Sequence, residues 1–233
     1  MIHRTFLLIL LVTALLSTAC SGSEEPMDPE VVIARSIERM GDVESVAFFL
    51  ERTGASVFID DDNLLEFTSA EGRFAAPEST DALLTVRAMG IPIQVGAVQM
   101  GGDTWMTNPV TGRWEDAPSG FTFDVATLFD RTQGWSSLLS GGLTNVHFIA
   151  EEESEGETLA HFGVTAPADR IEQITAGMVR GQAVDGDLWI QPSNGEIREL
   201  SFDTAMADGA TTWRLVMTDY GVEVEITVPD LNG

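Results

Sequence analysis

The 233-residue chain has few basic residues, and this scarcity already excludes some functions. Lys and Arg together number 12 against 37 Asp and Glu, which gives a formal net charge of −25. Nucleic acids and anionic lipid head groups are bound through clusters of basic side chains, so we expect no nucleic-acid partner. Because 44% of the residues are apolar, the chain can still build a core and differs from a disordered acidic segment.

The chain also lacks an apolar run long enough to span a membrane at its N-terminus. The run from Phe6 to Leu16 is well short of the roughly 20 residues that a spanning helix needs. It follows Arg4 and precedes the small residues Ser17 to Ala19, an order typical of a secretory signal. We therefore expect residues 1–19 to be a signal peptide and the protein to be exported.

Cysteine is nearly absent, and the single one, Cys20, directly follows the small residues. Bacterial lipoprotein signals place the lipid-accepting thiol at this position, although they prefer Leu where Ser17 stands here. We interpret Cys20 as a lipidated residue that anchors the protein to the outer face of the plasma membrane. The alternative is an ordinary secreted protein with one unpaired thiol. Residues 20–28 then form the lipidated cysteine and a short tether.

Residues 29–233 are expected to fold as a single domain, because no Pro- or Ser-rich linker divides them. Asp28 and Pro29 predict the start of a helix that ends at Gly41. Apolar residues at helical spacing predict two short helices at 125–129 and 135–139 and a third within 167–178.

Alternating and β-branched apolar residues predict strands over most of the remaining chain. The expected strands are several within 44–87, a hairpin over 83–100 turning near Gly90, a pair at 103–106 and 113–115, a pair at 144–150 and 158–165, and then 182–190, 196–203, 211–219 and 222–228. Pro92 indicates a sheet edge or bulge. The predicted fold class is α+β, an antiparallel sheet with short helices on one face.

Signatures of catalysis or metal binding are scarce. His147 and His161 both fall within predicted strands, where structural or surface roles fit them better, and no nucleophile elbow or metal-ligand spacing is present. The acidic runs 60–62 and 151–153 lack the alternate spacing of a calcium loop and fit solvated turns or strand ends. Gly101-Gly102 precedes no helix and is no phosphate loop. We expect neither an enzyme nor a cofactor nor a metal.

The order and spacing of several short motifs resembles the LppX/LprG (LppX_LprAFG) lipoprotein family. These motifs are the lipobox with the opening helix, the Met89-Gly90 hairpin, Gly102-Asp103-Thr104-Trp105 with Arg113-Trp114, Phe123-Asp124-Val125-Ala126-Thr127-Leu128-Phe129, Gly134-Trp135-Ser136-Ser137-Leu138-Leu139, and Met217-Thr218-Asp219-Tyr220-Gly221. The likeness covers nearly the whole mature chain.

The resemblance implies a curved half-barrel sheet with helices on its concave face, enclosing an apolar cavity for the acyl chains of a lipid or glycolipid. It also implies a fold similar to carriers of outer-membrane lipoproteins, and a role in carrying or presenting lipid in the cell envelope. The candidate cavity residues are on the apolar faces of the predicted helices, where core packing is the favoured role for any single one: Val125, Leu128, Phe129, Trp135, Leu138, Leu139, Ile171, Ile174 and Met178. The alternative is an envelope protein-interaction or sensor lipoprotein with no transport role. A transporter or other envelope partner is not identified by the sequence.

Overall fold

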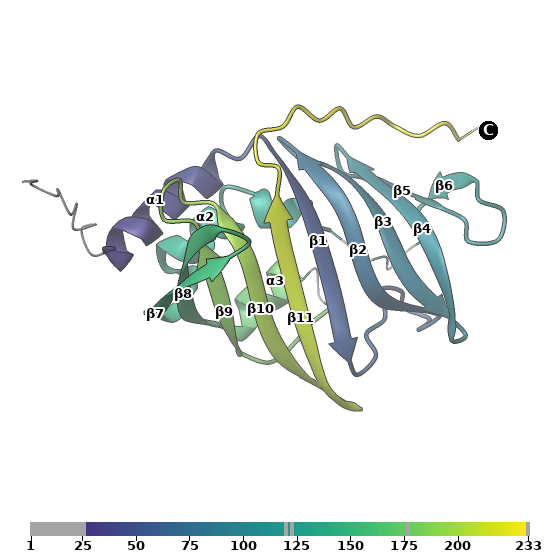
Figure 1. Cartoon of the computed structure of the whole chain (residues 1–233). Helices are drawn as coiled ribbons and strands as arrows, with labels where there is room; N and C mark the ends of the chain where they lie inside the picture. The colour runs from purple at the N-terminus through teal and green to yellow at the C-terminus, as the bar shows by residue number, and fades with distance from the viewer. Residues whose placement is uncertain (1–26, 119–120, 122–123, 176–177, 232–233) are drawn as a thin grey trace, which may run out of the picture.

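The protein is built on one antiparallel sheet of eleven strands (Figure 1). The computed structural model describes residues 27–118, 121, 124–175 and 178–231, so the expected signal peptide, Cys20 and most of the tether lie outside the described residues. The strand order is β6-β5-β4-β3-β2-β1-β11-β10-β9-β8-β7. The first strand, β1 (Ser45–Gly54), therefore pairs with the last, β11 (Gly209–Thr218), at the centre of the sheet.

The other strands follow the chain outward in two arms. One arm continues from β1, and the other ends at β11. The strands are β2 (Leu65–Ala75), β3 (Ser79–Ala88), β4 (Ile91–Met100), β5 (Asp103–Thr107) and β6 (Trp114–Asp116) in the first arm, and β7 (Thr144–Ser154), β8 (Glu157–Ala166), β9 (Val184–Ile190) and β10 (Ile197–Met206) in the second. This arrangement confirms the predicted α+β class.

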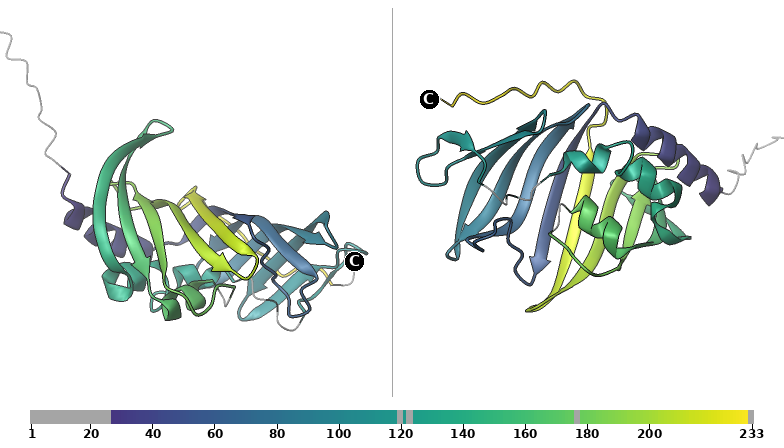
Figure 2. Two further views of the ribbon diagram at one scale, coloured as in Figure 1. Left: turned by 90° about the horizontal axis from the view of Figure 1, so that it is seen from below. Right: turned by 180° about the vertical axis from the view of Figure 1, so that it is seen from behind.

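The helices all lie on one face of the sheet, which we call the inner face (Figure 2). They are α1 (Pro29–Gly41), the 3₁₀ turn η1 (Ala126–Phe129), α2 (Trp135–Ser137), the π turn η2 (Leu138–Gly142) and α3 (Ala168–Ile174). Helix α1 begins as predicted, because an Asp28 carboxylate oxygen accepts the N–H of Glu30 at 3.0 Å and Pro29 stands at the first helical position.

Helix α1 is held against the turn between β9 and β10. A guanidinium nitrogen of Arg39 lies 2.8 Å from an Oε of Glu196. Gly195 in this turn has a φ of +78°, and a Cβ there would come within 2.7 Å of the Arg35 backbone. Only glycine therefore permits this close approach between the turn and helix α1.

The inner face carries the hydrophobic core, and its aromatic residues form a row across the centre of the sheet. The rings of Phe67 and Phe202 stack on either side of Trp213, with centroids 6.0 and 6.1 Å away. The indole N–H of Trp213 donates to Thr204 at 3.1 Å, so this buried ring has its polar partner. The segment before β2 covers one end of the row, since Val57 accepts the N–H of Phe67 at 2.8 Å.

Two local predictions are confirmed with a clear physical reason. Pro92 has no N–H to donate, and it lies in the part of β4 that β5 does not reach, because β5 pairs only with Ala97–Met100. The acidic run at 60–62 is a turn in which the Asp60 carboxylate accepts the N–H groups of Leu64 and Leu65. The run at 151–153 continues β7 as its end.

The strand predicted at 222–228 is wrong. This segment is extended but pairs with no strand among the described residues, and it runs along the end of the sheet (Figure 1). Asp219 has a φ of +52°, which ends β11, and the edges of β11 are already paired with β1 and β10. The side chain of Tyr220 then fixes the turn, because its hydroxyl donates to the carbonyl of Ile197 at 2.6 Å.

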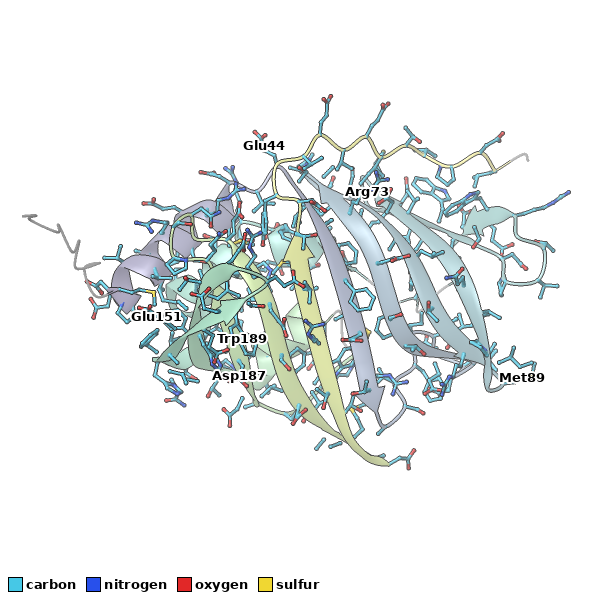
Figure 3. All side chains as sticks on the ribbon, viewed as in Figure 1. Glu44, Arg73, Met89, Glu151, Asp187 and Trp189 are labelled. Atoms are coloured by element: carbon cyan, nitrogen blue, oxygen red, sulfur yellow. The ribbon has the colours of Figure 1, made fainter. Side chains whose placement is uncertain are left out.

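The outer face of the second arm carries a polar cluster around His161, and two of its members, Asp187 and Trp189, are labelled in Figure 3. Its two ring nitrogens lie 2.7 Å from a Glu152 oxygen and 2.8 Å from an Asp187 oxygen, and its ring stacks on Trp189 with centroids 4.4 Å apart. These contacts tie β7, β8 and β9 together. His161 thus has a structural position within β8, as the sequence indicated.

Candidate functional site

A first cavity of about 20 Å³ lies between the helical layer and the second arm of the sheet. Trp135, Leu138 and Ile171 form its helical side. The sheet side is apolar as well, and the lining residues there are Val164, Ala166, Val184, Gly186, Leu188, Leu200 and Phe202, with Leu143 at one end. The Trp135 indole N–H is buried and has no hydrogen-bond partner among the residues that the structure describes.

A second cavity of about 50 Å³ lies next to the first. Its helical side is formed by Val125 and Leu128, with Met178 beyond α3. Its sheet side consists of Leu50, Leu200, Phe202, Trp213 and Leu215. Leu200 and Phe202 line both cavities, so these two side chains of β10 form the wall that separates them.

The second cavity has a polar end at Asp124 and Thr175. The Asp124 carboxylate accepts the hydroxyl of Thr127 at 2.8 Å and so fixes the start of η1. The hydroxyl of Thr175 donates to the carbonyl of Ile171 at 2.6 Å and accepts the N–H of Val179 at 3.1 Å. Both groups are satisfied by the protein, which leaves the cavity wall apolar.

A wider opening of about 730 Å³ lies on the surface beside η1. Phe129 borders it and stacks on Phe74, with ring centroids 4.4 Å apart. The next residue back, Leu128, borders the second cavity, so the turn η1 is the wall between this opening and the interior. The charged residues at the rim are Asp42, Glu44, Asp130 and Arg131.

The rim of the opening is therefore mostly acidic. Arg131 is paired with Asp42 at 3.2 Å, and both side chains are well exposed. A hydrogen bond from the Thr132 hydroxyl, helped by backbone N–H groups, lowers the pKa of Asp130, so this carboxylate is ionised at neutral pH. Two carboxylates, Glu44 and Asp130, remain without an arginine in this rim.

The structure places the predicted cavity residues in three groups. Val125, Leu128 and Met178 line the second cavity, and Trp135, Leu138 and Ile171 line the first. Phe129 borders the opening instead, and Leu139 packs in the core without lining either cavity. Ile174 belongs to α3, but its side chain lies outside the described residues.

Comparisons with known proteins agree with this architecture. The family model of the LppX_LprAFG lipoproteins matches residues 28–226, a range that includes every residue lining the two cavities. The chain belongs to this family. Among solved structures, LprF from Mycobacterium bovis is similar with a TM-score of 0.66 at 14% identity, over 88% of this chain and 99% of that one.

A second solved relative of this LppX_LprAFG lipoprotein is LppX from Mycobacterium tuberculosis. It has a TM-score of 0.60 at 19% identity, over 86% of this chain and 100% of that one. At such identities the likeness shows the shared fold. No curated protein matches the chain in sequence.

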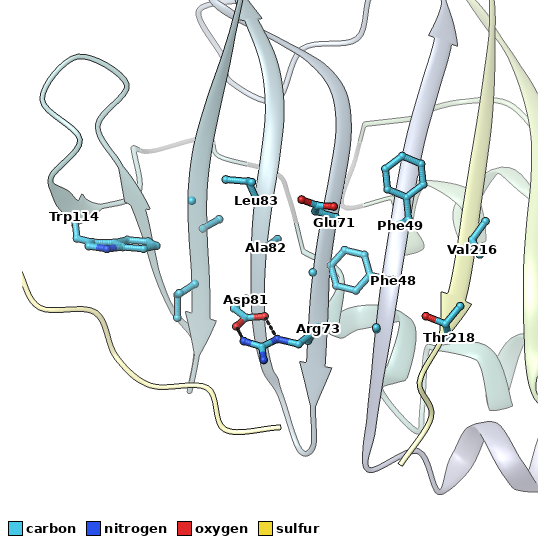
Figure 4. Close-up of a pocket in the computed structure, with 15 residues that line it drawn as sticks. Phe48, Phe49, Glu71, Arg73, Asp81, Ala82, Leu83, Trp114, Val216 and Thr218 are labelled. Carbon is cyan, nitrogen blue, oxygen red and sulfur yellow. Dashed lines mark hydrogen bonds and ion pairs between the residues drawn. The ribbon is translucent and has the colours of Figure 1, made fainter. Parts of the chain in front are cut away.

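The outer face of this lipoprotein has a hollow of its own, of about 600 Å³, over the first arm (Figure 4). It is open to solvent, and its walls include Phe49, Leu83 and Trp114. The hollow exists because small residues, Ala47 and Gly96, stand among these larger ones.

The hollow is polar at one end. The guanidinium of Arg73 pairs with the carboxylate of Asp81, as the dashed lines in Figure 4 show, and its Nε lies 3.1 Å from one oxygen. This hydrogen bond raises the pKa of Arg73 above its ordinary value. The carboxylate of Glu71 also lines the hollow. The hollow on the outer face of the first arm is thus an open surface with both apolar and charged walls.

The sheet side of the cavities was not predicted from the sequence. Leu200 and Phe202 line both cavities, and they occupy inward-facing positions of β10. The signal was present, because β10 coincides with the strand predicted at 196–203 and pairs with the one predicted at 211–219. Among the described residues, no helix has both the length and the apolar character of a membrane span. No group of His, Cys, Asp and Glu residues in this part of the chain could hold a metal ion.

Proposed function

We propose that this LppX_LprAFG lipoprotein binds the acyl chains of a lipid or glycolipid between its helical layer and the inner face of its sheet. Residues 1–19 would direct export, Cys20 would carry the membrane anchor, and 29–233 would form the binding domain. The protein would then carry or present its ligand in the cell envelope, beside the outer face of the plasma membrane.

The observation that carries this proposal is the pair of adjacent apolar cavities that share Leu200 and Phe202 as lining residues. Short helical turns lie over both, and Asp124 is the one charged side chain among the described residues that line them. Such a space excludes polar ligands, because each buried polar group would lack a partner. An acyl chain has no polar group that needs a hydrogen-bond partner.

The cavities must grow to accept a lipid, since ligand pockets usually measure about 300–1,000 Å³. The helical layer is suited to such movement. Its turns η1, α2 and η2 are short, and Gly134 and Gly141 lie between and within them. Each buried methylene contributes about 0.8 kcal/mol, so one long acyl chain supplies on the order of 10 kcal/mol to offset the displacement.

Access would run past η1. Moving Phe129 away from Phe74 would join the surface opening to the second cavity, because Leu128 on the same turn lines that cavity. The acidic rim would repel an anionic head group, so an uncharged or sugar head group fits this opening best. Inside, the unpartnered indole N–H of Trp135 is a donor available to an ester carbonyl or hydroxyl of the ligand.

The test uses residues 21–233, which include all described residues but not Cys20. The protein is expressed in bacterial cells, purified without detergent, weighed by native mass spectrometry and extracted with organic solvent. We expect near one-to-one lipid with the wild type. The Leu200→Trp variant should purify without lipid, because the larger side chain takes up space in both cavities.

The matched control is Val216→Trp, which adds the same ring on the outer face at the edge of the open hollow. It should retain the lipid. If the wild type has only its apo mass and takes up no fluorescent lipid afterwards, the proposal is wrong. The fold would then serve an envelope protein-interaction or sensor role, the alternative that the sequence left open.

A further inference from the structure

The hairpin turn between β3 and β4 is apolar and fully exposed. Met89 is 91% exposed, Ile91 is 62% exposed, and Leu64, in the loop before β2, is 59% exposed. Leu65 pairs with Ala88, and Ala88 pairs with Ile91, so the sheet register brings Leu64, Met89 and Ile91 to one corner. We call these three side chains the apolar tip.

The turn also carries a residue that its backbone disfavours. Met89 has a φ of +49° and Gly90 a φ of +80°, the pattern of a type I′ turn. Asn-Gly is the favoured pair in such turns, and a methionine at positive φ is uncommon. The methionine gains nothing from the fold, because it lies almost wholly in solvent. The conformation and exposure of Met89 therefore direct attention to a contact outside the chain.

The shape of the tip decides which kind of partner fits. Met89 projects away from the body of the protein at one end of the sheet (Figure 3). From Ala88 to Ile93 no side chain is charged or hydrogen-bonding. A protein interface needs a complementary surface that buries about 1,000 Å² or more, which three side chains on a turn cannot supply. A bilayer needs no complementary shape and accepts a protruding apolar turn directly.

We propose that the apolar tip inserts into the surface of a lipid bilayer and gives the protein a membrane contact independent of its anchor. The start of α1, which follows the proposed anchor in the sequence, and the β3–β4 turn lie at opposite ends of the molecule (Figure 1). The contact is with uncharged or zwitterionic lipid, because a chain with a net charge of −25 is repelled by anionic head groups. This inference goes beyond the proposed cavity function and does not depend on it.

The experiment uses phosphatidylcholine vesicles and residues 21–233, so that no acyl anchor contributes. Binding is measured by vesicle flotation over a range of lipid concentrations. The double variant Met89→Asn/Ile91→Thr should need at least about fivefold more lipid for the same bound fraction. The turn substitution should not lower the melting temperature of this variant, since Asn suits the first central position of a type I′ turn better than Met does.

Val110→Thr is the matched control, because Val110 is also 91% exposed but lies in the β5–β6 loop. It should bind vesicles like the wild type. A second readout is oxidation by peroxide: vesicles should slow sulfoxide formation at Met89 at least threefold and leave the half-buried Met206 unchanged.

The proposal is overturned if the wild type does not float with the vesicles, or if the Met89→Asn/Ile91→Thr variant floats equally well. Equal binding to phosphatidylglycerol vesicles at low salt would also contradict the proposed lipid preference. The Leu200→Trp variant separates this proposal from the cavity function, because it should lose co-purified lipid and still bind vesicles.

Discussion

The two faces of the sheet each carry a hollow, and the two differ in size and in chemistry. The inner cavities measure about 20 and 50 Å³ and are closed and apolar, whereas the outer hollow measures about 600 Å³ and carries Arg73, Asp81 and Glu71. The outer hollow lies on strands that are hydrogen-bonded to one another, and this pairing fixes the width of the hollow. The inner cavities lie under the short turns η1, α2 and η2, which would have to move to admit a lipid. The proposed binding therefore depends on displacement of the helical layer, whereas the outer hollow is already open.

The greatest loss of stability should follow from truncating a side chain of the inner cavity wall. Leu138 is fully buried and lines the first cavity, so Leu138→Ala should lower the free energy of unfolding by about 2–5 kcal/mol. Leu83→Ala on the outer face should cost much less, since Leu83 is only half-buried. Urea unfolding followed by tryptophan fluorescence measures both.

Equal losses for these two variants would show that the outer hollow is packed like the core. Added lipid provides a second check. It should raise the unfolding midpoint of the Leu138→Ala variant toward that of the wild type, because a ligand that binds only the folded state stabilises it.

A smaller effect should follow from loosening the access route. Phe129 and Phe74 stack at 4.4 Å, and such a pair contributes about 0.5–1.5 kcal/mol beyond its buried area. Phe129→Leu removes this stacking and should favour displacement of η1. We expect several-fold faster uptake of a fluorescent lipid in stopped-flow measurements.

Phe49→Leu on the outer face is the matched control for this change, since Phe49 lines the outer hollow and is 37% exposed. Its uptake rate should equal that of the wild type. An unchanged rate for Phe129→Leu would place the route elsewhere.

Periodicity in the sequence predicted most of the elements and half of the inner wall. The helical faces at Val125 and Leu128 and at Trp135 and Leu138 were found because the spacing of apolar residues reports which side is buried. Periodicity could not show which residues of the sheet lie opposite these helices, and so Leu200 was not predicted as a cavity residue.

The same limit explains the wrong strand at 222–228. Alternation of apolar and polar residues reports a pattern suited to a sheet, but pairing also needs a free strand edge. At the end of β11 both edges are occupied, by β1 and β10. The order of all the strands in the sheet decides which edges remain free. A local sequence pattern does not contain this order.

The outer face also differs between the two arms, because the second arm has a polar cluster where the first has the hollow. Hydrogen bonds from Trp189 and then from His161 lower the pKa of Glu152 below its ordinary value of 4.5. The two ring nitrogens of His161 lie 2.7 Å from a Glu152 oxygen and 2.8 Å from an Asp187 oxygen, so the ring links the carboxylates of two strands.

Acid should therefore weaken the second arm. A carboxylate with a lowered folded-state pKa adds stability that is complete above pH 4.5 and is lost as the pH falls through the lowered pKa. The deficit of Glu152→Gln relative to the wild type should be present at pH 7 and shrink below pH 4.5. Denaturant unfolding at several pH values measures it, and a deficit independent of pH would contradict this account.

A change at the polar end of the outer hollow should have the least effect on stability. The Arg73 and Asp81 side chains are 49% and 24% exposed, and ion pairs at this exposure contribute at most about 1 kcal/mol because water and salt screen them. Arg73→Gln should therefore change stability by less than about 1 kcal/mol and leave the co-purified lipid unchanged.

A loss of lipid in the Arg73→Gln variant would move the ligand from the inner cavities to the outer face. The Arg39–Glu196 pair gives the contrasting case, because its side chains are less exposed, at 28% and 11%, and it holds α1 beside the helical layer. Arg39→Gln should therefore cost more stability than Arg73→Gln. Of these two ion pairs, the one that supports the helical layer beside the inner cavities would then have the larger effect on stability.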